Sequence, residues 1–103
     1  MPTINEEIMS IISTTLTDLF GPQTTDTVFA FCERNGLPVV LIPQRLVPFG
    51  RLLEALMGEV TANYTCNMIA RNILAEFHMA IDGEQVSLEE ASRVVWNQRK
   101  LRV

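Results

Sequence analysis

The sequence predicts a mainly α-helical fold of about five helices, with one short strand at 39–42. Apolar side chains recur every three or four residues along most of the chain, which is the spacing of one helical face. Hydrophobic residues make up 48% of the 103 residues, enough to form a core and too many for a disordered chain. The length fits one domain, so we expect residues 1–103 to fold as a single unit.

The first helix is expected over residues 4–20, where apolar side chains share one face. Thr3 followed by Glu6 is a capping-box pattern, in which the two side chains satisfy backbone N–H groups at the start of a helix. Gly21-Pro22 is expected to end this helix, because proline cannot continue a helix and disfavours helical geometry in the residue before it.

Four further helices follow from the same spacing. The second is expected to begin at Thr25 or Asp26, either of which can cap it, and to end at Asn35-Gly36. Gly50 and Gly58 fall inside the third helix and are expected to weaken it by about 1 kcal/mol each. The last three helices are expected over about 48–60, over 65–80, and from Ser87 onward.

A short strand is expected between Pro38 and Pro43, where four aliphatic residues stand together. One strand cannot satisfy its own backbone hydrogen-bonding groups, and the sequence shows no second strand pattern. We therefore expect the strand to pair with its own copy across a homodimer. The candidate dimer-interface residues are Val39, Val40, Leu41 and Ile42.

The composition argues against several functional classes. Twelve acidic residues outnumber eight basic ones, and this balance disfavours non-specific nucleic-acid binding by the chain as a whole. Without a long apolar stretch or a basic leader, we expect no membrane partner and a cytoplasmic location. Cys32 and Cys66 lack the spacing of zinc ligands, and His78 is the only histidine. We therefore expect no metal, no other cofactor and no enzymatic activity.

Positive charge is concentrated at the end of the sequence, where residues 93–103 hold half of the basic residues and no acidic one. At helical spacing, part of this segment forms one face that could contact phosphates, with the tryptophan stacking on a base. Alternatively, the cations stabilise the end of a helix through its dipole while the tryptophan covers the core. The candidate DNA-binding residues are Arg93, Trp96, Arg99, Lys100 and Arg102.

Residues 4–60 show an order of elements that resembles a known family. A helix, a short loop, a helix ending in cysteine and a charged pair, a glycine, an aliphatic strand and another helix follow one another. The residues that carry the resemblance are Ala30, Cys32, Glu33, Arg34, Gly36, Val40, Ile42 and Pro43. The order is similar to that of the middle operon regulator (Mor) family of phage transcription activators.

The resemblance implies a homodimer in which residues 1–60 form the dimerisation part. It further implies that residues 61–103 form a helical, helix-turn-helix-like part that binds DNA. Two features depart from the family pattern. Gln44-Arg45 stands where the family has arginine and glycine, and the expected turn at 81–86 is longer than the usual turn of this motif.

Two functions remain open at this point. The first is a dimeric, phage- or prophage-type transcriptional regulator that binds DNA through its C-terminal helices. The alternative is an acidic, phage-type interaction protein that binds and inhibits a host protein or a defence complex without binding DNA. DNA binding needs a contiguous positive face, whereas a protein partner needs an exposed apolar or acidic patch.

Overall fold

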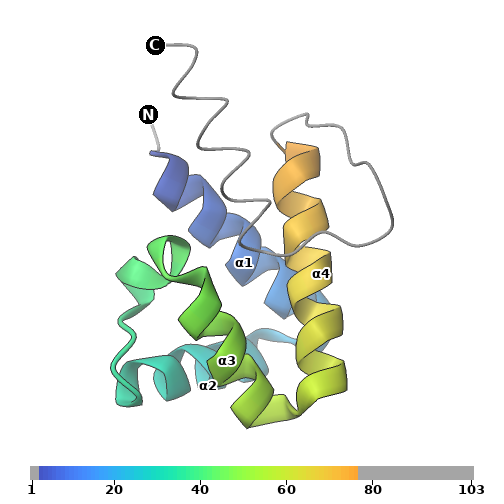
Figure 1. Ribbon diagram of the computed structural model, residues 1–103. Helices are drawn as coiled ribbons and strands as arrows, with labels where there is room; N and C mark the ends of the chain where they lie inside the picture. The colour runs from blue at the N-terminus through green and yellow to red at the C-terminus, as the bar shows by residue number, and fades with distance from the viewer. Residues whose placement is uncertain (1–2, 77–103) are drawn as a thin grey trace.

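The computed structural model describes residues 3–76, and these residues form five helical segments. The segments are α1 (Ile4–Phe20), α2 (Pro22–Arg34), the 3-10 helix η1 (Val39–Gln44), α3 (Leu46–Met57) and α4 (Glu59–Glu76) (Figure 1). The mainly helical class is therefore confirmed for this part of the chain, while the helix expected from Ser87 lies outside it. None of the helices within residues 3–76 is long and apolar enough to cross a membrane.

Helix α1 begins and ends where the sequence predicts. The Thr3 hydroxyl accepts a hydrogen bond from the Glu6 backbone N–H at 3.1 Å, which satisfies one of the open donors at the helix start. The helix ends at Gly21, directly before Pro22. Its buried apolar face confirms the helical spacing that predicted it.

Two single glycines turn the chain between consecutive helices. Gly21 joins α1 to α2 and Gly58 joins α3 to α4, with φ angles of +91° and +87°. Each glycine N–H donates to the carbonyl four residues earlier, at 2.8 and 2.9 Å respectively. Each glycine carbonyl accepts from the N–H four residues later, at 3.2 and 3.0 Å. One residue thus closes one helix and opens the next, in a backbone conformation that is almost restricted to glycine.

Both α2 and α4 begin earlier than the sequence predicts. Pro22 occupies the first turn of α2, where its missing N–H costs nothing. Thr25, expected as a cap, is buried inside α2, and its hydroxyl lies 3.1 Å from the Thr17 hydroxyl of α1. Helix α4 begins at Glu59 rather than near residue 65, because Gly58 ends α3 instead of lying within it.

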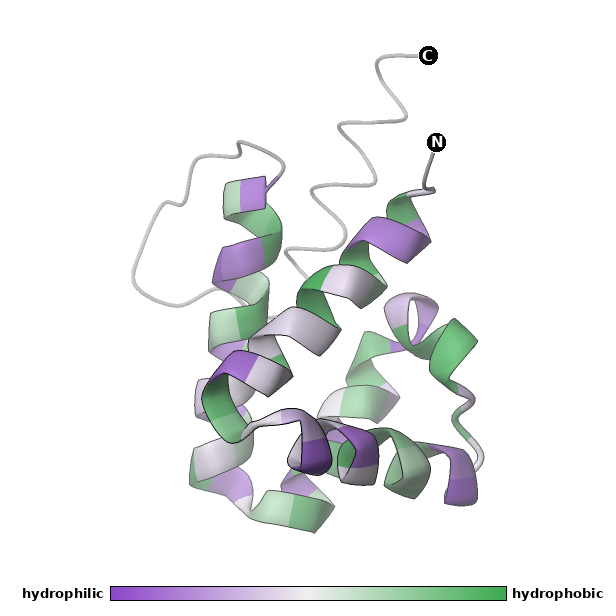
Figure 2. Cartoon of the chain, turned by 180° about the vertical axis from the view of Figure 1, so that it is seen from behind, coloured by the Kyte–Doolittle hydropathy of each residue, from purple (hydrophilic) through white to green (hydrophobic). Residues whose placement is uncertain are grey.

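The strand predicted at 39–42 is wrong, because these residues belong to η1. The Leu41 N–H donates to the Pro38 carbonyl at 2.9 Å, and the Arg45 N–H donates to the Ile42 carbonyl at 3.0 Å. These local bonds satisfy backbone groups that a strand would have paired with a second copy. Figure 2 shows that the segment is hydrophobic over most of its length. Apolar side chains of this segment pack in the core of the same chain.

The core lies where the α1–α2 pair meets the α3–α4 pair. Helix α1 packs against α2 and α4, and α3 packs against α4 and α2, while η1 contacts α1, α2 and α3 (Figure 1). The buried apolar residues are Ile8, Ile12, Leu16, Val28, Cys32, Leu37, Ile42, Leu46, Phe49, Leu53, Ala62, Ile69, Ala70, Ile73 and Leu74. All five segments contribute to this set, so residues 3–76 share one core.

Candidate functional site

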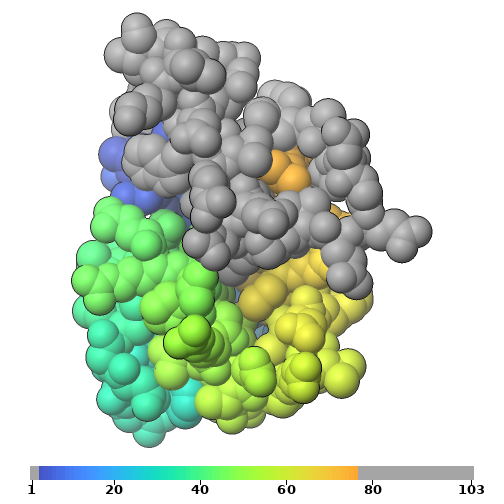
Figure 3. All heavy atoms as spheres, viewed as in Figure 1, coloured from blue at the N-terminus to red at the C-terminus, as the bar shows by residue number. Residues whose placement is uncertain are grey.

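Large apolar side chains are exposed at the connection between α3 and α4. Val60 and Tyr64 lie one turn apart on the same face of α4 and are 84% and 57% exposed. Leu56, in the last turn of α3, is 37% exposed. We call Leu56, Val60 and Tyr64 the apolar corner. The α3–α4 connection, yellow-green in Figure 3, lies at the surface in the lower part of the face shown.

Contacts on the inner side hold α3 and α4 together at this corner. The Thr65 side chain is buried, and its hydroxyl lies 2.8 Å from the Thr61 carbonyl and 3.8 Å from the Met57 sulfur. Further along the pair, a Cβ atom placed on Gly50 of α3 would lie 3.8 Å from the Cys66 sulfur of α4. The exposed side chains of the corner therefore stand on two closely packed helices, which fixes their relative positions.

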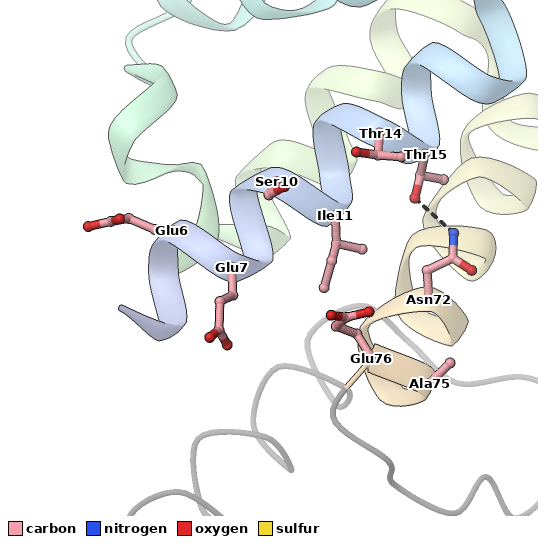
Figure 4. A pocket seen from close by; sticks show the side chains of 9 residues that line it. All are labelled: Glu6, Glu7, Ser10, Ile11, Thr14, Thr15, Asn72, Ala75 and Glu76. Carbon is pink, nitrogen blue, oxygen red and sulfur yellow. Dashed lines mark hydrogen bonds between the residues drawn. The ribbon is translucent and has the colours of Figure 1, made fainter. Parts of the chain in front are cut away.

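A groove with a volume of about 540 Å³ runs between α1 and α4. Its described lining consists of Glu6, Glu7, Ser10, Ile11, Thr14 and Thr15 from α1 and Asn72, Ala75 and Glu76 from α4 (Figure 4). Three of these side chains are carboxylates and none is basic, so we call the feature the acidic groove.

One hydrogen bond joins the two walls of the acidic groove. The Asn72 side-chain amide donates to the Thr15 hydroxyl at 2.8 Å. Figure 4 shows this bond at one end of the groove, with the side chains of Ile11 and Glu76 pointing toward one another further along. The bond links α1 and α4 at this end of the groove.

The described residues include two free cysteines, Cys32 and Cys66. Burial raises the pKa of the Cys32 and Cys66 thiols above their ordinary value of 9.0. Both thiols therefore stay protonated at neutral pH, and the thiolate is the nucleophilic form. Within residues 3–76, no group of three or more histidine, cysteine, aspartate or glutamate side chains could hold a metal ion.

The structure does not gather the predicted dimer-interface residues on one face. Ile42 is buried, Val39 and Leu41 are partly buried, and Val40 is 77% exposed. They therefore do not present a common edge to a partner. The predicted DNA-binding residues, Arg93, Trp96, Arg99, Lys100 and Arg102, lie outside the described residues, as does His78.

Sequence reasoning missed the apolar corner because it treats Gly58 as part of a helix interior. In one long helix, Leu56 and Val60 would lie four residues apart on a single face. The glycine corner instead starts a new helix, on which Val60 is exposed and shares a face with Tyr64. A glycine between two stretches of helical spacing was the signal that could have located the corner.

The sequence indicates the acidic groove less clearly than it indicates the apolar corner. Ser10 and Thr14 are four residues apart on α1, and Asn72 and Glu76 are four residues apart on α4. Each pair marks a polar helical face. Nothing in the sequence indicates that these two faces lie opposite one another, because that depends on how α1 and α4 pack.

The chain matches no family model, and no curated protein or solved structure shows significant similarity to it. The resemblance to the Mor family therefore stays a prediction.

Proposed function

We propose that the protein is a non-catalytic binding module that contacts another protein through the apolar corner. The observation that carries this proposal is the joint exposure of Val60 and Tyr64 on one face of α4. Single exposed apolar residues are common on protein surfaces, whereas neighbouring ones indicate an interaction site. Tyrosine is enriched in such sites, because its ring buries a large apolar area while its hydroxyl can form a hydrogen bond.

The partner that we propose first is a second copy of the chain. In a two-fold symmetric contact, the same patch of both copies meets itself. Val60 and Tyr64 would then be removed from water in both chains, without any need for the strand pairing that the structure contradicts. The homodimer therefore stays a proposal, with the apolar corner in place of residues 39–42 as its interface.

Replacing Val60 with aspartate and Tyr64 with serine is expected to weaken dimerisation at least tenfold, which corresponds to about 1.4 kcal/mol. The double variant removes the apolar area and would bury a charge in the interface. Aspartate in the first turn of α4 is compatible with the helix, because the helix dipole favours negative charge there. Sedimentation velocity over a concentration series measures the dissociation constant directly.

Val47→Asp provides the matched control for this experiment. Val47 is also an exposed valine in the first turn of a helix, but it lies at the start of α3 rather than at the corner. We expect this variant to dimerise like the unmodified chain. An unmodified chain that remains monomeric at every concentration, or equal weakening by both substitutions, would contradict the corner as the self-association surface.

A second candidate function, DNA binding by a regulator, is favoured by the separation of charge along the sequence. Residues 93–103 hold four of the eight basic residues, and all twelve acidic residues lie before them. In this proposal, Arg93, Arg99, Lys100 and Arg102 contact phosphates while Trp96 stacks on a base. The acidic remainder of the chain limits non-specific contact elsewhere.

Arg99→Ala with Lys100→Ala is expected to weaken binding to all DNA sequences alike and to reduce the salt slope by about two units. For each phosphate contact that is lost, about one counterion fewer is released from the DNA when the protein binds. Fluorescence anisotropy with a labelled duplex, starting at about 50 mM salt, measures both effects. Arg34→Ala with Arg51→Ala is the control with an equal loss of charge, and we expect it to leave the slope unchanged. Absence of binding at the lowest salt would exclude this candidate.

A further inference from the structure

We draw no further inference here: the strongest candidate, the acidic groove between α1 and α4, is a cluster of carboxylates in which nothing within residues 3–76 indicates a ligand, and one of them, Glu7, already has an interaction partner.

Discussion

Replacing Phe49 with alanine is expected to lower the free energy of unfolding by about 3–5 kcal/mol. Phe49 is the largest fully buried side chain within residues 3–76, and it lies on α3, which contacts α2, α4 and η1. The cost has two parts, the lost transfer of the ring out of water and the cavity that remains. Domains of this kind are stable by only about 5–15 kcal/mol, so this one substitution removes a large part of the total.

Urea unfolding followed by circular dichroism measures this loss. Val47→Ala on the same helix is the control, because Val47 is exposed and we expect a change below about 0.5 kcal/mol. If Phe49→Ala does not fold, Phe49→Leu retains most of the volume and is expected to lose about 1 kcal/mol. A loss below about 1 kcal/mol in the alanine variant would show that Phe49 does not fill the core.

The parts of the fold that could be predicted from the sequence are those set by local chemistry. The start of α1 depends on the Thr3 hydroxyl and an N–H three residues away, and its end depends on the adjacent Gly21-Pro22 pair. The end of α2 is equally local, since Gly36 adopts a positive φ of 85° and the Leu37 N–H donates to the Cys32 carbonyl at 2.9 Å. Such patterns need no knowledge of how the helices pack.

The segment at 39–42 could not be predicted in the same way, because aliphatic residues between prolines suit both a strand and a short buried helix. The hydrogen bonds of η1 run to carbonyls three residues earlier, so the backbone needs no partner chain. Burial of Ile42 then favours the local solution, because the core of the same chain receives its side chain. Strand propensity largely reflects such packing context rather than the backbone itself.

The candidate surfaces could be predicted only in part, because they depend on contacts between distant residues. The hydrogen bond that joins the walls of the acidic groove connects Thr15 to Asn72, 57 residues further along the chain. The sequence shows a polar face on each helix but not which faces meet. At the apolar corner, the sequence contained the necessary residue, Gly58, but a glycine inside a helix and a glycine between two helices have the same local pattern.

Replacing the glycine inside α3 and the glycine at its end with alanine is expected to change the free energy of unfolding in opposite directions. Gly58 has a φ of +87°, which alanine adopts only with strain, so Gly58→Ala should lower the free energy of unfolding by about 1–3 kcal/mol. No atom lies within 4 Å of the Cβ position at Gly58, and the cost therefore comes from the backbone rather than from a clash. Gly50 has an ordinary helical conformation and room for a methyl group, since its nearest neighbour would be the Cys66 sulfur at 3.8 Å.

Gly50→Ala is consequently expected to raise the free energy of unfolding by about 0.4–1 kcal/mol, because alanine loses less backbone entropy on folding than glycine does. Thermal and urea unfolding of the two variants, side by side with the unmodified chain, measure both changes. The pair controls for the general effect of a glycine-to-alanine change, because that effect has the same sign at both positions. If Gly58→Ala raised the free energy of unfolding, residue 58 would not be held at a positive φ. Helices α3 and α4 would then form one continuous helix, and Val60 would lie on its inward face.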